Sequence, residues 1–101
     1  HLSVTTRLTQ LFASLNAKTN HNNPKFQSFL QVVAIAQNDL LQKQEIPQIV
    51  AARFTNTIYQ YELKTPPEVT DDLAAVRKLI SSNGYGYVRP VNYMPSYQLQ
   101  K

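Results

Sequence analysis

The chain has 101 residues, which suits a single domain, because two cores would each be about half the usual size. Hydrophobic residues make up 43% and charged residues 16%, which excludes the apolar-poor, charge-rich composition of a disordered chain. Cysteine is absent, so disulfides, thiolate zinc sites and cysteine nucleophiles are excluded as well.

The chain has ten lysines and arginines and six acidic residues, which gives a net charge of +4. The basic residues are spread along the chain, and only Arg77 and Lys78 are adjacent, whereas nucleic-acid-binding proteins usually cluster them. The longest apolar run, residues 32–36, is far shorter than the roughly 20 residues that a membrane span needs. The opening residues show no basic-then-apolar secretory leader. We therefore expect a cytoplasmic protein without a transmembrane segment.

Helical patterns fill the first four-fifths of the chain. The two glycines, Gly84 and Gly86, both lie near the end, and so long a run without glycine favours helices over strands and turns. Apolar residues recur at spacings of three and four, as on one face of an amphipathic helix. The predicted helices span about 4–19, 24–43, 47–63 and 66–82.

Three of these helices have recognisable start signals. Ser3 is a predicted N-cap of the first helix, and Asn23 followed by Pro24 predicts the start of the second. Thr65 and Glu68 have the spacing of a capping box, in which each side chain bonds to the other residue's backbone. We expect this box to begin the fourth helix.

The loops between the predicted helices are short, so neighbouring helices must run antiparallel. The sequence therefore predicts an all-α fold, an antiparallel up-down four-helix bundle in one domain. Asp39 and Lys43, four residues apart on the second helix, predict a weak surface ion pair. Asn83 and Gly84 predict a left-handed cap that closes the fourth helix.

Residues 84–101 differ in composition and predict an extended C-terminal arm along the bundle. They hold four of the six tyrosines and two prolines, which prevent a continuous helix. Tyrosine suits both packing and recognition, because its ring can be buried while its hydroxyl stays in water. Each tyrosine could instead only pack against the fourth helix, and Arg89 could simply be solvated; arginine can also bind a carboxylate through two parallel hydrogen bonds. The candidate partner-binding residues are Tyr85, Tyr87, Arg89, Tyr93 and Tyr97.

Residues 46–93 carry a family resemblance. The run Ile-Pro-Gln-Ile-Val at 46–50, the aromatic pair Tyr59 and Tyr61, and Asn-Gly-Tyr at 83–85 followed by Arg89 and Tyr93 resemble immunity proteins of pediocin-like (class IIa) bacteriocins, nearest the enterocin A immunity type. The resemblance implies a cytoplasmic four-helix bundle that protects a Gram-positive producer from its own peptide. It further implies association with the mannose phosphotransferase permease once that peptide has docked, with specificity in the C-terminal half.

Catalysis is not expected, and neither a cofactor nor a metal site is predicted. His1 is terminal, and His21 lies in an asparagine-rich loop without an acidic neighbour, so no nucleophile, base and orienting group can be assigned. Asp71 and Asp72 are better explained by the positive end of the helix dipole, because adjacent helical residues point about 100° apart. We therefore expect the surface of the bundle to carry the function.

Two other functions remain open. A helical protein-binding adaptor or antitoxin-like module would use a tyrosine-rich arm equally well. A nucleic-acid-binding bundle is less favoured, because helix-turn-helix units usually have a tight turn and a basic recognition helix, whereas the predicted third helix holds Arg53 near its middle and is followed by Lys64 at its end.

Overall fold

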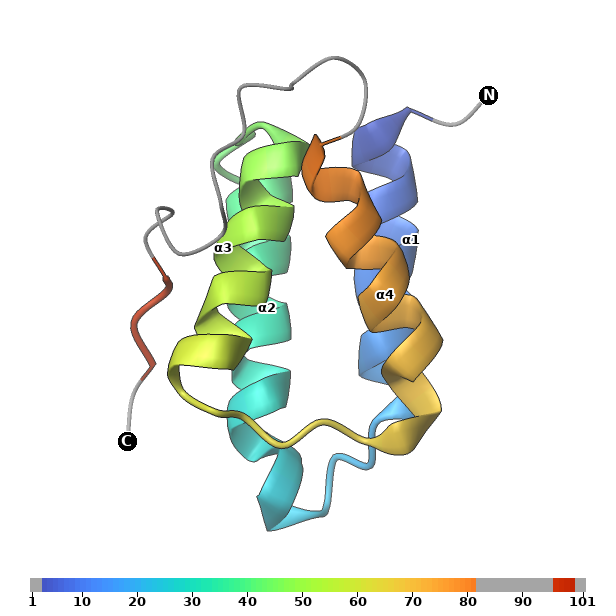
Figure 1. Cartoon of the computed structure of the whole chain (residues 1–101), viewed down its shortest axis with the longest axis vertical. Coiled ribbons are helices and arrows are strands. Elements are labelled where there is room, and N and C mark those ends of the chain that lie inside the picture. Colours follow the sequence, from blue (N-terminus) through green and yellow to red (C-terminus); the bar gives the residue numbers. More distant parts are fainter. Residues whose placement is uncertain (1–2, 82–95, 100–101) are drawn as a thin grey trace.

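The computed structural model describes residues 3–81 and 96–99, and these form helices and connections with no strand among them. The structure has four α-helices, and successive helices run in opposite directions (Figure 1). The predicted all-α four-helix bundle is thereby confirmed for this part of the chain. The helices are α1 (Val4–Lys18), α2 (Gln27–Leu41), α3 (Pro47–Gln60) and α4 (Thr70–Lys78).

The four helices pack around one core, and α1 and α3 also contact each other across it. Helix α1 packs beside α2 and α4, and α3 packs beside the same two helices from the other side. Short 3₁₀ turns precede α2 and α4, and a third follows α4, at Pro24–Phe26, Pro67–Val69 and Leu79–Ser81. Residues 84–95 of the predicted arm (84–101) and the predicted cap at Asn83 and Gly84 lie outside the described residues.

The predicted cap at Ser3 is confirmed, and the predicted cap at Asn23 is confirmed for the 3₁₀ turn that leads into α2, which itself begins at Gln27. The Ser3 hydroxyl accepts a hydrogen bond from the Thr6 amide at 3.0 Å. The Asn23 side chain accepts one from the Lys25 amide at 2.9 Å, with Pro24 opening the turn. Each cap satisfies an amide that the helix itself leaves without a partner.

The predicted capping box before the fourth helix is wrong. The N-cap is Pro66, which has the extended backbone φ −71°, ψ 145° and offers no side-chain acceptor. Pro66 precedes Pro67, and a residue before proline is pushed out of the helical region. The helical turn therefore begins one residue later than Thr65 and Glu68 would require.

Helix α3 ends earlier than the predicted residue 63. The Leu63 amide donates to the Ile58 carbonyl at 3.0 Å while Glu62 takes a left-handed φ of 51°, which is the arrangement of a Schellman motif. Glycine usually occupies that position, and the chain has none before residue 84. The motif nevertheless closes α3 and directs the chain toward α4.

Aromatic packing fills the centre of the bundle. The Phe54 ring of α3 contacts Phe12 of α1 at 5.1 Å and Phe29 of α2 at 6.3 Å between ring centroids, both at tilted angles near 57–58°. All three rings are fully buried. Such tilted contacts add to the stability that comes from burial alone. The core thus fixes α2 and α3 relative to each other, and these two helices carry the site described next.

Candidate functional site

Tyr97 is the only predicted partner-binding residue within the described part of the chain. Tyr85, Tyr87, Arg89 and Tyr93 lie outside it. The site is therefore built around Tyr97 and residues 96–99, which lie beside α3 in Figure 1 (red).

Residues 96–99 have no regular secondary structure, but hydrogen bonds hold them against α3. Three hydrogen bonds join this segment to residues near the C-terminal end of α3 or just beyond it. The segment therefore follows the helix for about one turn. The Tyr97 amide donates to the Thr57 hydroxyl at 2.8 Å, the Ser96 hydroxyl to the Gln60 side chain at 2.9 Å, and the Leu99 amide to the Tyr61 hydroxyl at 3.4 Å.

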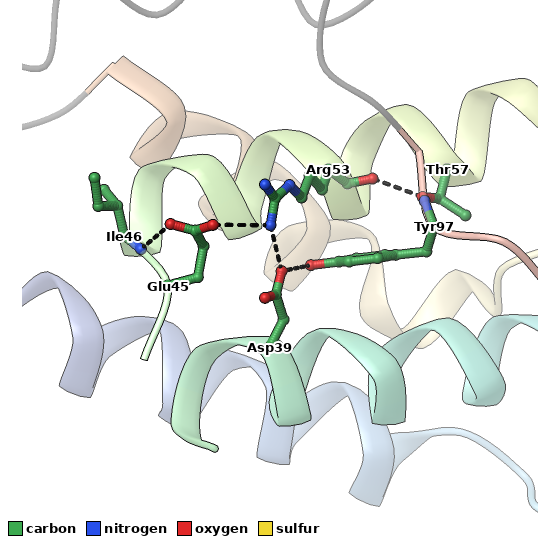
Figure 2. Close-up of polar contacts among 6 residues, drawn as sticks. All are labelled: Asp39, Glu45, Ile46, Arg53, Thr57 and Tyr97. Atoms are coloured by element: carbon green, nitrogen blue, oxygen red, sulfur yellow. Dashed lines mark hydrogen bonds and ion pairs between the residues drawn. The ribbon is translucent and has the colours of Figure 1, made fainter. Parts of the chain in front are cut away.

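The Tyr97 side chain packs against the hydrophobic core and reaches across to α2. Its hydroxyl donates to Asp39 Oδ2 at 2.7 Å (Figure 2). The sequence left open whether this tyrosine packs or recognises a partner. The structure places it against α2 and α3 rather than the fourth helix, and its role in binding a partner stays a prediction.

Arg53 of α3 completes the polar cluster. Its Nη1 lies 2.9 Å from Asp39 Oδ2 and 3.1 Å from Glu45 Oε2, so one guanidinium nitrogen joins two carboxylates (Figure 2). The other Glu45 oxygen accepts from the Ile46 amide at 2.9 Å, which holds the carboxylate at the start of α3. Asp39, Glu45, Arg53 and Tyr97 therefore form one connected group, called here the Asp39 cluster.

The turn between α2 and α3 brings Glu45 to this cluster. Gln44 has a left-handed φ of 56°, and the Glu45 amide donates back to the Asp39 carbonyl at 3.1 Å. The chain thereby doubles back over the end of α2, and a side chain that follows the helix returns to face Arg53.

The predicted pair of Asp39 with Lys43 is not formed among the described residues. Asp39 is buried, with 8% of its side chain exposed, and it turns toward Arg53 and Tyr97 instead. Arginine suits such a site better than lysine, because its flat guanidinium can serve several acceptors at once.

Electrostatic effects agree with this geometry. Burial raises the pKa of the Tyr97 phenol, and the hydrogen bond to the Asp39 carboxylate raises it further. For Arg53, burial works to lower the pKa, but the neighbouring Asp39 and Glu45 carboxylates outweigh it, so the net pKa is raised. Both groups are thus held in their ordinary protonation states at neutral pH.

A recess of about 310 Å³ opens beside the Asp39 cluster. The carboxylate in it already receives hydrogen bonds from a guanidinium and a phenol, which makes it an anchor for the segment and leaves it poorly suited to accept a substrate proton. The recess is lined by Ile35, Asn38, Asp39, Lys43, Arg53, Ser96, Tyr97 and Gln98.

Two exposed tyrosines lie near the C-terminal end of α3, Tyr59 within the helix and Tyr61 at its C-cap. Tyr59 is 63% exposed and Tyr61 is 41% exposed. Tyr61 also accepts the Leu99 amide, so it belongs both to the anchor and to the surface. Aromatic side chains of this kind are common in protein interfaces.

Sequence reasoning missed the anchoring roles of Asp39, Arg53 and Thr57. One signal was present: Asp39 continues the apolar stripe of α2 through Val32, Val33 and Ala36, all of which are buried. A carboxylate on such a stripe requires a partner, because an isolated buried charge is strongly unfavourable. The identity of that partner depends on how α2 and α3 pack.

Among residues 3–81 and 96–99, no three histidine, cysteine or acidic side chains gather as a metal-binding group. In the same part of the chain, no helix is long and apolar enough to cross a bilayer.

Comparison with family models, curated proteins and solved structures finds no significant match for this chain.

Proposed function

We propose that this chain is an immunity protein of the class IIa bacteriocin type. It protects the producing bacterium by binding, on the cytoplasmic side of the membrane, the mannose phosphotransferase permease that already carries the peptide. In this role it works without catalysis or a cofactor, as a helical bundle that presents a surface at the inner face of the membrane.

The observation that carries the proposal is the anchoring of the C-terminal segment on α3. Tyr97 and Leu99 bond to Thr57 and Tyr61. Tyr59 and Tyr61 belong to the residues that resemble the immunity family. The anchor therefore brings the end of the arm beside Tyr61, in the half that the resemblance makes responsible for specificity.

Protection of living cells tests the proposal. The chain is expressed in a strain sensitive to several pediocin-like peptides, and survival against each peptide is compared with an empty vector. We expect a rise in survival against at least one peptide and none against an unrelated pore-forming peptide. Equal survival with and without the chain against the whole panel contradicts immunity and leaves the adaptor function as the better account.

The arm is tested by replacing residues 84–95 with a glycine-serine segment of equal length, which keeps the anchor at 96–99. We expect protection to be lost while the helical circular-dichroism signal and the thermal midpoint stay close to the original. Gln10→Ser, on the exposed side of α1, is the control and should keep protection. Full protection by the replaced chain would remove the arm from the mechanism.

A further inference from the structure

A second recess, of about 200 Å³, lies between α3 and α4, away from the Asp39 cluster. It shares no lining residue with the recess beside Tyr97. It is lined by Phe54, Thr55, Ile58, Tyr59, Thr65, Leu73 and Arg77.

Helical spacing explains how these side chains meet. On α3, Phe54 and Ile58 are one turn apart, as are Thr55 and Tyr59, so two neighbouring rows of that helix face the recess. Phe54 and Thr55 are buried and form its floor, while the exposed Tyr59 stands at its rim. The interior is therefore mainly apolar, and its mouth is open to solvent.

The size of the recess limits what fits. An apolar cavity of about 150 Å³ in a protein interior accepts a benzene-sized molecule. A volume of about 200 Å³ thus has room for one leucine- or phenylalanine-sized side chain, and it is too small for a helix or strand. Burial of such a side chain against Phe54 and Ile58 is favourable because both remove apolar surface from water.

Arg77 places a free positive charge at the mouth. Its side chain is exposed and makes no ion pair or hydrogen bond with any residue in 3–81 or 96–99. The residues one turn before it on α4 are Leu73 and Ala74, so no carboxylate neutralises it from its own helix. Asp72, the nearby acid of α4, is already bound by Lys18 of α1.

We propose that this recess binds the C-terminal residue of a partner polypeptide, with an apolar side chain in the recess and the terminal carboxylate on Arg77. A carboxylate and a guanidinium can form two parallel hydrogen bonds, which also fix orientation. This inference rests on the recess alone and does not depend on the immunity proposal.

The small recess favours a chain end over an internal acidic residue. In an extended segment the neighbouring side chain points the other way, and the next one on the same side lies about 6–7 Å further along. A terminal residue carries both the apolar group and the charge on one Cα. Leu73 and Arg77, one helical turn apart, both line the recess and offer it an apolar wall and a cation.

The probe for this site is N-acetyl-leucine, compared with N-acetyl-leucine amide, which has the same side chain without the charge. Each is titrated into the whole ¹⁵N-labelled protein, and amide shifts are followed by NMR. We expect saturable shifts at the residues around the recess, with the acid binding about fivefold or more tightly than the amide, because only the acid pairs with Arg77.

Two matched variants decide the role of the charge. Arg77→Gln should make the acid and the amide bind equally, whereas Lys78→Gln, which removes the adjacent exposed charge, should keep the difference. An unchanged spectrum away from the substitution shows that each variant is folded. Three results would overturn the proposal. They are the absence of saturable shifts, equal binding of acid and amide to the original protein, and loss of the acid–amide difference in both variants. Shifts of the recess that depend on protein concentration overturn it too, in favour of a second copy of the chain.

Discussion

Two edges of the bundle each have an aspartate that is bonded to one hydroxyl and one cationic side chain, and we expect the two edges to contribute differently to stability. Between α1 and α4, the Asp72 carboxylate accepts hydrogen bonds from the Ser14 hydroxyl at 2.7 Å and from the Lys18 ammonium at 3.1 Å. Between α2 and α3, Asp39 accepts a hydroxyl from Tyr97 and a guanidinium from Arg53.

The two edges differ in burial. The Lys18 and Asp72 side chains are 49% and 16% exposed, against 26% for Arg53 and 8% for Asp39, so water and salt weaken the Lys18–Asp72 attraction more. Asp39 is buried, so its partners are hard to replace by water. We therefore expect burial, more than the number of polar contacts, to decide which edge contributes more to stability, and the buried edge also holds the C-terminal segment at 96–99.

Removing the buried carboxylate should have the largest effect. Asp39→Ala leaves Tyr97 without its acceptor and Arg53 with Glu45 alone, and we expect it to lower the free energy of unfolding by about 2–4 kcal/mol. Urea unfolding followed by circular dichroism measures this. A loss below about 1 kcal/mol would mean that the α2–α3 edge is no stronger than the α1–α4 edge.

Removing only the phenol hydroxyl should have a smaller effect. Tyr97→Phe keeps the ring and loses one hydrogen bond to a charged group, so we expect a loss of about 1–2 kcal/mol at pH 7.

The same substitution has a pH signature. The folded pKa of Tyr97 lies above the value of about 10 for an unfolded tyrosine, so its contribution is complete below pH 10 and is lost as the pH rises beyond it. The original protein should therefore lose more stability than Tyr97→Phe above about pH 10. Parallel alkaline curves for the two proteins would contradict the hydrogen bond to Asp39.

At the α1–α4 edge, we expect Asp72→Asn to lower the free energy of unfolding by only about 0.5–1 kcal/mol at pH 7 and low salt. Burial alone would raise the pKa of Asp72, but Ser14 and Lys18 more than compensate and hold it below its usual value. The contribution is thus present above about pH 4 and is lost as the pH falls further. The variant and the original protein should converge in stability near pH 2; a gap that persists there argues against a charge effect.

Lys43→Gln should have the smallest effect, within about 0.3 kcal/mol, because Asp39 bonds to Arg53 and Tyr97 instead. Thermal unfolding at low ionic strength is sensitive enough to detect it. A clear destabilisation by Lys43→Gln would restore the ion pair that the sequence predicted and weaken the contrast between the two edges.

Local patterns were sufficient to predict the bundle. The spacing of apolar residues predicted the four helices, and the Ser3 and Asn23 caps depend only on residues two or three positions away. The capping box at Thr65 was wrong for an equally local reason, the restriction that Pro67 places on Pro66.

The site was less predictable because its contacts join distant residues. Asp39 lies 14 residues from Arg53 and 58 from Tyr97 in the sequence, and their meeting depends on how α2, α3 and the C-terminal segment pack. The sequence did identify Tyr97 as a candidate partner-binding residue, because residues 84–101 are rich in tyrosine. It gave no reason to connect Tyr97 with Asp39 until the packing of the helices was known.

The claim that Tyr97 anchors the C-terminal segment through Asp39 is tested most directly by the cost of Tyr97→Phe in two backgrounds. We predict a loss of about 1–2 kcal/mol in the original protein and less than about 0.5 kcal/mol in Asp39→Ala, where the acceptor is already gone. An equal loss in both backgrounds would show that the two residues act independently and would contradict the anchor.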